Sequence, residues 1–168
     1  GKTSREVFEY RNKNNQGHQN DFLTVGSMGH CSQIALGIAL EKNNKQVYVL
    51  DGDGAVIMHM GSLAILGSEA PENFRHILLN NGSHDSVGGQ PTAGFKTDFS
   101  AIARACGYKL SITAETEKEI KKGLSRIKKI PGPAFLEIRV NKGSRKDLGR
   151  PTSTPVENKI ALMNNLSK

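Results

Sequence analysis

Two stretches decide the fold of this chain: VYVLDGDG at residues 47–54 and HILLNNG at residues 76–82. In each, an apolar run suited to a buried strand ends in a tight polar corner, first Gly-Asp-Gly and then Asn-Asn-Gly. Parallel strands bring their carboxyl ends to one edge of a sheet, where open α/β folds bind ligands. We therefore expect Asp53 and Asn81 to meet at one sheet edge although they lie far apart in the sequence.

The residue types at this edge predict a cation site. One carboxylate, one amide oxygen and a nearby backbone carbonyl form an incomplete oxygen set of the kind Mg²⁺ uses while phosphate oxygens and water complete its shell. A calcium loop starting at Asp51 is excluded because its fifth position is Ala55 and its twelfth is Ser62 rather than glutamate. No G-x-G-x-x-G or P-loop lysine motif opens a helix, which argues against a dinucleotide or simple NTPase site.

A GDG corner, a helix-length insert and an NN corner in this order resemble the cofactor-binding signature of thiamine diphosphate enzymes, and the chain is similar to their diphosphate-binding domain. The resemblance implies an open three-layer α/β sandwich with a mainly parallel sheet and helices on both faces. It implies that Asp53, Asn81 and the backbone carbonyl of Ser83 bind Mg²⁺. Further residues expected to contact the cofactor surround the first corner: Gly52, Gly54 and Ala55.

The segment Gly26-Ser27-Met28-Gly29 resembles a second part of this signature. In the family, a backbone carbonyl at the first position accepts a hydrogen bond from the aminopyrimidine, and a bulky apolar side chain holds the cofactor in its bent form. The resemblance assigns these roles to Gly26 and Met28, with Ser27 as a further cofactor contact. Taken without its neighbours, Met28 is equally well interpreted as a core residue.

Strand-like and helix-like runs alternate along the chain, which predicts right-handed crossovers, a parallel sheet and one domain over residues 1–168. Strands are expected at 22–25, 47–50, 76–79, 108–112 and 134–140. Helices are expected at 31–40, 56–66, 99–106 and 156–166, and after Thr116, where Thr116 and Glu119 form a capping box.

The glycine-rich and proline-containing segment 82–94 is expected to be a loop that leaves directly from the metal corner. Loops on a rigid scaffold often carry functional residues. We expect His84 and Asp85 to take part in catalysis, and Ser86 and Gln90 to contact substrate. A solvated loop histidine is the alternative for His84. A Ser-His-Asp triad is not indicated, because consecutive residues cannot easily align as nucleophile, base and orienting acid.

A second irregular segment, 141–155, concentrates the basic surplus of a chain whose net charge is +7. Nucleic-acid binding is not expected, since only 5% of the residues are aromatic and no nucleic-acid module is recognisable. The segment is either a solvated basic tail or a site in which Arg145 or Arg150 clamps a phosphonate, a role that suits planar bidentate donors.

Length and composition indicate a globular chain of 168 residues with one hydrophobic core, and an enzyme is the default expectation. No apolar run is long enough to cross a bilayer and no signal-peptide core is present, so membrane association is not expected and the cytoplasm is the expected location. Cys31 and Cys106 lack CxxC spacing, which favours a reduced compartment. Because the chain begins at Gly1 without methionine, we interpret it as a processed or excised piece.

Within the thiamine diphosphate family, the segments HDSVGGQPT (84–92) and GSRKDLGRPT (143–152) most resemble the phosphonopyruvate decarboxylases. The resemblance implies conversion of a 2-oxo acid, 3-phosphonopyruvate, to phosphonoacetaldehyde and CO₂ with thiamine diphosphate and Mg²⁺, as a step of phosphonate biosynthesis. The sulfopyruvate decarboxylases, whose β-type subunit has this domain, are the relatives left open. A non-catalytic anion-binding module and a purely structural subunit are the alternatives from other classes.

The resemblance also implies a partner. In the family, a glutamate that activates the cofactor belongs to a separate pyrimidine-binding domain, and no segment of this chain matches that domain. We expect it either in the same polypeptide or in a partner subunit of a homo- or hetero-oligomer. The isolated chain is therefore expected to be inactive.

Overall fold

The computed structural model describes all 168 residues, which group into two compact units. One unit is Met28–Lys142, and the other combines the two ends of the chain, Gly1–Ser27 and Gly143–Lys168. The expectation of one domain over residues 1–168 stays a prediction. None of the helices is both long enough and apolar enough to span a membrane.

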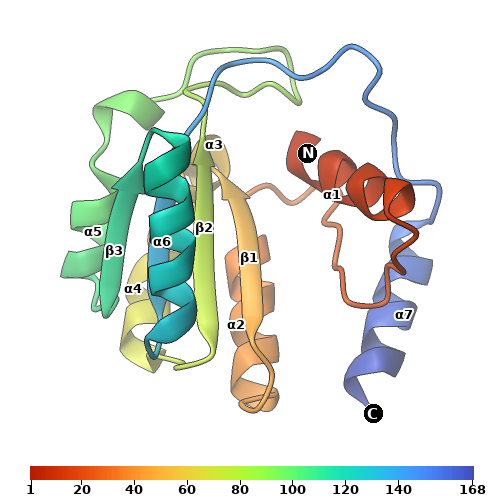
Figure 1. Cartoon of the computed structure of the whole chain (residues 1–168), viewed down its shortest axis with the longest axis horizontal. Coiled ribbons are helices and arrows are strands. Elements are labelled where there is room, and N and C mark those ends of the chain that lie inside the picture. The colour runs from red at the N-terminus through yellow and green to blue at the C-terminus, as the bar shows by residue number, and fades with distance from the viewer. The chain divides into compact units, whose positions relative to one another are not determined.

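The Met28–Lys142 unit is built on a sheet of four strands, all parallel (Figure 1). In sheet order these are β1 (Val47–Gly52), β2 (Phe74–Asn80), β4 (Ala134–Arg139) and β3 (Leu110–Ala114). Gly52 of β1 lies opposite Leu79 of β2, and Asn80 lies opposite Arg139 of β4. All strands therefore end at the same edge of the sheet, as the alternating sequence pattern predicts.

Helices cover both faces of this sheet (Figure 1). On one face lie α2 (Cys31–Glu41), α4 (Ser62–Glu69) and α5 (Phe99–Ala105), and on the other lies α6 (Glu117–Lys129). The residues of β4 alternate between two cores: Phe135 packs toward the first group of helices, whereas Leu136 packs with Ile127 of α6. The predicted open three-layer α/β sandwich is confirmed, and α6 begins with the predicted Thr116–Glu119 capping box.

Several buried polar side chains contact one another in the larger core, which lies between the sheet and helices α2, α4 and α5. His76 has no exposed surface, its Nδ1 lies 3.1 Å from the Tyr108 hydroxyl, and its Nε2 lies 3.4 Å from Asp51 Oδ2. The Asp51 carboxylate also accepts a hydrogen bond from the Cys31 thiol. Burial raises the pKa of Cys31 and that of Tyr108. Both of these groups are therefore held in their neutral forms.

The unit formed by the chain ends contains α1 (Lys2–Lys13) and α7 (Pro155–Leu166). Residues 141–154 between β4 and α7 are irregular, as predicted. Arg145 in this segment forms ion pairs with Glu6 and Glu9 of α1 and with Asp147. The hydrogen bond from Arg145 lowers the pKa of Glu9, and the same hydrogen bond raises the pKa of Arg145. The C-terminal helix is confirmed, beginning one residue before the predicted 156–166.

Three element predictions are wrong in detail. Residues 22–25 form no strand, because the Leu23 N–H donates to the Asn158 side chain of α7 at 2.8 Å instead of joining a ladder. The single helix predicted at 56–66 is two helices, α3 (Asp53–Met58) and α4, interrupted at residues 59–61. The strand predicted at 108–112 begins two residues later, because Tyr108 extends into the core toward His76.

Candidate functional site

The two polar corners meet at the carboxyl edge of the sheet, as the sequence predicts. β1 and β2 are hydrogen-bonded neighbours, and their register pairs Gly52 with Leu79. Asp53 follows directly as the first residue of α3, and Asn81 follows the last residue of β2. An acidic residue in the first turn of a helix interacts favourably with the backbone N–H groups there. Adjacent strand ends thus supply a carboxylate and an amide to one corner, which we call the metal corner: Asp53, Asn81 and Ser83.

Asp53 is a buried carboxylate without a cationic partner. It is 2% exposed, and the Thr92 hydroxyl donates a hydrogen bond to its Oδ2. None of the ion pairs in the structure includes Asp53. A buried charge is expensive unless it is paired or coordinates a metal. The surroundings of Asp53 therefore fit a bound cation.

Asn81 and Ser83 are held by a carboxylate from the following loop. The Asn81 amide donates from Nδ2 to Asp85 Oδ2 at 2.7 Å, and the Ser83 hydroxyl donates to Asp85 Oδ1 at 2.9 Å. The Ser83 N–H donates to Asn81 Oδ1 at 3.0 Å. Asp85, predicted to be catalytic, thus lies against the predicted metal ligands, where it orients the Asn81 amide.

The loop after this corner folds back on itself. Ser83 forms an isolated antiparallel bridge with Pro91, and the His84 N–H donates to the Gln90 carbonyl at 2.8 Å. The His84 ring lies against Gly54 of the first corner, where an added Cβ would be 2.4 Å from the ring. The side chains of Ser86 and Gln90 are exposed. The loop therefore brings His84 to the GDG corner and leaves Ser86 and Gln90 accessible.

The remaining predicted residues are distributed over both units. Met28 lies in the Met28–Lys142 unit and is half-buried. Gly26 and Ser27 belong to the unit of the chain ends and have left-handed backbones, with φ of 69° and 42°. In the same unit, Arg150 is exposed, whereas Arg145 is half-buried and engaged by carboxylates.

The donor set fits a hard cation. No group of three or more His, Cys, Asp or Glu side chains in the chain could hold a metal. The metal corner instead offers one carboxylate, one amide oxygen and one backbone carbonyl, oxygen donors that suit Mg²⁺ when a ligand's phosphates and water supply the rest. Asp53, Asn81 and Ser83 would hold such an ion.

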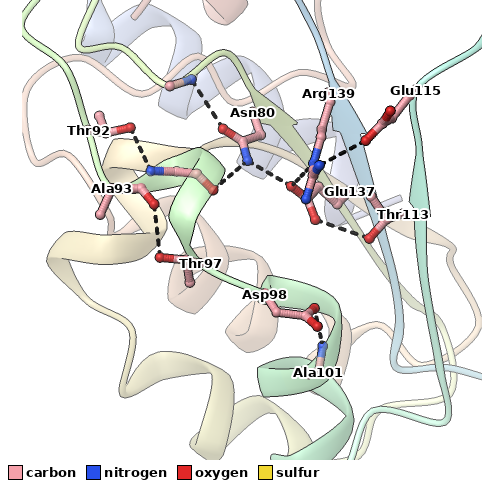
Figure 2. A network of polar contacts seen from close by, with 12 residues as sticks. Asn80, Thr92, Ala93, Thr97, Asp98, Ala101, Thr113, Glu115, Glu137 and Arg139 are labelled. Atoms are coloured by element: carbon pink, nitrogen blue, oxygen red, sulfur yellow. Dashed lines mark hydrogen bonds and ion pairs between the residues drawn. The ribbon is translucent and has the colours of Figure 1, made fainter.

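Three residues of this edge were missed in the sequence: Asn80, Thr92 and Gly94. Asn80 is fully buried, and its amide donates to the Gly94 carbonyl at 2.9 Å (Figure 2). An added Cβ at Gly94 would lie 2.4 Å from both Asn80 Oδ1 and Asp53 Oδ2. The first asparagine of the NN corner and the glycine after the loop were the available signals, but only the fold shows that Asn80 bonds to Gly94 and that Gly94 packs against Asp53.

Comparison with known proteins agrees with this geometry. The family described as "Thiamine pyrophosphate enzyme, C-terminal TPP binding domain" matches residues 1–138, which include both corners. The chain belongs to the thiamine pyrophosphate enzyme family. Thiamine pyrophosphate and thiamine diphosphate are the same compound, so the family predicted from the GDG and NN corners is confirmed.

Individual members of the thiamine pyrophosphate enzyme family are also similar to this chain. Phosphonopyruvate decarboxylase of Streptomyces viridochromogenes is 38% identical over 157 residues, which cover 94% of this chain and 38% of that protein. Sulfopyruvate decarboxylase subunit beta of Methanocaldococcus jannaschii is 36% identical over 133 residues, which cover 76% of this chain and 67% of that protein. The chain thus spans well under half of the phosphonopyruvate decarboxylase that it matches.

The fold is that of solved thiamine pyrophosphate enzymes. The Rhodococcus jostii RHA1 thiamine diphosphate-dependent 4-hydroxybenzoylformate decarboxylase matches with a TM-score of 0.59 at 20% identity, over 70% of this chain and 24% of that chain. A thiamin diphosphate-dependent enzyme of Mycobacterium smegmatis matches with a TM-score of 0.58 at 23% identity, over 70% of this chain and 23% of that chain. At these identities the likeness establishes the fold.

Proposed function

We propose that this chain supplies the diphosphate- and magnesium-binding half of a thiamine diphosphate-dependent decarboxylase that converts 3-phosphonopyruvate to phosphonoacetaldehyde and CO₂. The observation that carries the proposal is the buried Asp53 carboxylate, which has a neutral hydroxyl and no cation as its partner, at the corner shared with Asn81. A Mg²⁺ ion bound there with a diphosphate would supply the missing positive charge.

When bound, the cofactor would supply a thiazolium ring that can act as the electron sink for decarboxylation of a 2-oxo acid. The protein's part is to bind and orient. In the proposal, Asp53, Asn81 and the Ser83 carbonyl hold the metal, and Asp85 fixes the Asn81 amide through its hydrogen bond. Gly52, Gly54 and Ala55, together with Gly26, Ser27 and Met28, are proposed to contact the cofactor.

The loop at residues 82–94, which carries His84, is the proposed substrate-facing segment of the Met28–Lys142 unit. His84 lies against Gly54, next to the proposed diphosphate site, and is therefore the candidate for proton transfer to or from the substrate. Ser86 and Gln90 are exposed on the same loop and are proposed substrate contacts. Of the two arginines predicted to clamp the phosphonate, Arg150 has no ion pair, whereas Arg145 is held by Glu6, Glu9 and Asp147. We therefore favour Arg150.

The assignment of the substrate rests on the relatives, and sulfopyruvate is the second candidate. Proteins named phosphonopyruvate decarboxylase match over 94% of this chain, and a sulfopyruvate decarboxylase subunit beta matches over 76%. The wider match supports 3-phosphonopyruvate. The name "subunit beta" supports a partner chain with the pyrimidine-binding domain, so that the enzyme is an oligomer, and we place it in the cytoplasm. An anion-binding module without catalysis is expected to bind independently of Mg²⁺, which would leave the buried Asp53 carboxylate without a counter-charge.

The test is decarboxylation of 3-phosphonopyruvate, sulfopyruvate and pyruvate by the chain assembled with its pyrimidine-binding domain, thiamine diphosphate and Mg²⁺. We expect the highest kcat/KM for 3-phosphonopyruvate. A preference for sulfopyruvate would retain the cofactor site and replace the substrate. Absence of turnover with all three 2-oxo acids in a cofactor-loaded assembly would reject the proposed activity.

Variants of the metal corner test the site independently of the substrate. Asp53→Ala and Asn81→Ala each remove a proposed metal ligand and should weaken Mg²⁺-dependent cofactor binding by more than about 100-fold, because even loss of an outer partner costs 10–100-fold. Asp98→Ala is the matched control: Asp98 is an exposed carboxylate that caps α5 by accepting from the Ala101 N–H. It should cost about 1 kcal/mol of stability and leave cofactor affinity unchanged.

A further inference from the structure

Three polar side chains form a row across the carboxyl ends of three neighbouring strands. Asn80 comes from β2, Glu137 from β4 and Thr113 from β3, and the register pairs Thr113 with Glu137. Asn80 Nδ2 donates to Glu137 Oε1 at 2.7 Å, and the Thr113 hydroxyl donates to Glu137 Oε2 at 3.1 Å. Figure 2 shows Glu137 between Asn80 and Thr113, with Arg139 bonded to both Glu137 and Glu115.

Glu137 is a buried carboxylate on the face of the sheet that also carries His76 and Asn80 of β2. Its exposed fraction is 0%, and its one ion-pair partner is Arg139, whose Nε lies 3.3 Å from Oε1. Burial of a carboxylate costs several kcal/mol, and an apolar residue of similar volume is often at least as stable at such a position. Stability alone is therefore a poor explanation for a glutamate at this position.

What Glu137 does is fix the orientation of the Asn80 amide. A carboxylate only accepts hydrogen bonds, so it forces the NH₂ end of the amide toward β4 and the carbonyl end away from it. In this orientation Asn80 Nδ2 donates to the Gly94 carbonyl at 2.9 Å, and Asn80 Oδ1 accepts from the Gly82 N–H at 3.2 Å. The reversed amide would place its NH₂ group against the Gly82 N–H, which is repulsive.

The two backbone groups that Asn80 holds belong to the two sides of the metal corner. Gly82 lies between Asn81 and Ser83 and has a left-handed φ of 64°. The hydrogen bond from its N–H to Asn80 Oδ1 helps to hold the turn that presents these two residues. Gly94 packs directly against the Asp53 carboxylate. One amide thus connects the Asn81 side of the corner to the Asp53 side, and Glu137 determines which way that amide faces.

We propose that Glu137 is a positioning residue for the metal corner: acting through Asn80, it holds Asn81, Ser83 and Asp53 in the arrangement that binds a magnesium-diphosphate group. This inference rests on the proposed function, because it assumes that the corner binds that group. Glu137 itself touches neither the metal nor the cofactor in this proposal. Its effect is to keep the binding-competent arrangement populated in the absence of ligand.

The size of the effect follows from the Asn80 hydrogen bond. Loss of the Glu137 carboxylate leaves a buried N–H of the Asn80 amide unsatisfied, a cost that other orientations of the amide can avoid. If the competent arrangement falls to about a tenth of the population, the apparent dissociation constant rises about tenfold. Glu137→Met should therefore weaken Mg²⁺-dependent binding of thiamine diphosphate by about tenfold or more.

Two further variants separate positioning from general stability. Glu137→Gln keeps an oxygen that accepts from Asn80 Nδ2 and should bind the cofactor within about threefold of the wild type. Thr113→Val removes the hydrogen bond to the other oxygen of the same carboxylate without touching Asn80. It should lower the urea concentration at the unfolding midpoint slightly and leave cofactor affinity unchanged.

The experiment is calorimetric titration of thiamine diphosphate with Mg²⁺ into the assembled enzyme, with urea unfolding of the same variants. Tenfold weaker binding in Glu137→Met, with near-normal binding in Glu137→Gln and Thr113→Val, supports the proposal. Equal binding by folded Glu137→Met and wild type would overturn it and leave the proposed function intact. Equal losses in Glu137→Met and Thr113→Val would also overturn it. A wild-type enzyme that binds no cofactor would overturn both.

If Glu137→Met does not fold, the isosteric variant Asn80→Asp carries the test. It removes the donor to Glu137 and places two carboxylates side by side, so affinity should fall. Adding Glu137→Gln restores one donor between positions 80 and 137 and should recover part of the affinity. Absence of any recovery in the double variant would count against the pair acting together.

Discussion

Gly94 offers a direct test of how closely the metal corner is packed. An added Cβ would lie 2.4 Å from Asn80 Oδ1, 2.4 Å from Asp53 Oδ2 and 2.9 Å from Thr92 Oγ1. Ordinary van der Waals contact begins near 3.5 Å, so Gly94→Ala forces two buried side chains back by about 1 Å. The Gly94 N–H also donates to the Thr92 hydroxyl at 3.0 Å, which keeps the backbone from moving away easily.

The expected cost combines two effects. Overpacking of a dense site costs about 1–3 kcal/mol. Displacement of Asp53 from the Thr92 hydroxyl loses a hydrogen bond to a charged acceptor, which contributes about 1.5–3 kcal/mol. Gly94→Ala should therefore lower the free energy of unfolding by about 3 kcal/mol or more. It should also weaken Mg²⁺-dependent cofactor binding more than about tenfold, because both sides of the corner move.

Urea unfolding measures the first effect without any ligand, and calorimetry measures the second. Gly37→Ala is the matched control: Gly37 is exposed on α2, and an added Cβ there meets nothing within 4 Å. Its replacement should stabilise the helix by about 0.5–1 kcal/mol. The reasoning is refuted if Gly94→Ala unfolds within about 0.5 kcal/mol of the wild type and binds the cofactor equally well.

Two further predictions concern the larger core. Gly67→Ala on α4 would place a Cβ 1.6 Å from the Cys106 carbonyl oxygen, so the backbones of α4 and of the end of α5 must separate. The free energy of unfolding measured in urea should fall by more than about 3 kcal/mol. An unchanged unfolding midpoint would contradict the close approach. Burial raises the pKa of the Cys31 thiol in the folded protein. The thiol's contribution to stability is therefore fully present below the pKa of about 8.5 that it has in the unfolded chain. As the pH rises above about 8.5, the unfolded chain ionises first, and the free energy of unfolding falls by at most about 1.4 kcal/mol per pH unit. Cys31→Ala should therefore lose less stability than the wild type between pH 8.5 and 10 in urea titrations, and equal losses would show that the thiol ionises freely in the folded protein.

The sequence was sufficient for the sheet and for the meeting of the two corners, because apolar runs that end in GDG and NN fix both the strand ends and their polar residues. It was less informative where backbone groups bond to side chains. Residues 22–25 have strand composition, yet the Leu23 N–H bonds to Asn158 more than a hundred residues later. The helix α1 was missed because Phe8 is its one buried residue, which leaves almost no apolar periodicity to detect.

The candidate site shows the same division. Asp53 and Asn81 were recognisable from their motifs, whereas Glu137 looked like one charged residue within the strand AFLEIR. Its burial depends on a register that places it between Asn80 and Thr113, and such pairings across strands cannot be obtained from local patterns. Arg145 appeared free in the sequence for a similar reason, since its partners Glu6 and Glu9 lie at the other end of the chain.

The central claim is that Asp53 is a ligand of the Mg²⁺ ion through which the protein binds the diphosphate of the cofactor. The most direct measurement is calorimetric titration of thiamine diphosphate into the assembled wild-type enzyme and its Asp53→Ala variant, with Mg²⁺ and with EDTA. We predict tight binding in the wild type with Mg²⁺ alone, and weak binding in the variant that Mg²⁺ does not improve. Tight binding to the wild type in EDTA, or Mg²⁺-dependent binding of normal affinity in Asp53→Ala, would contradict the claim.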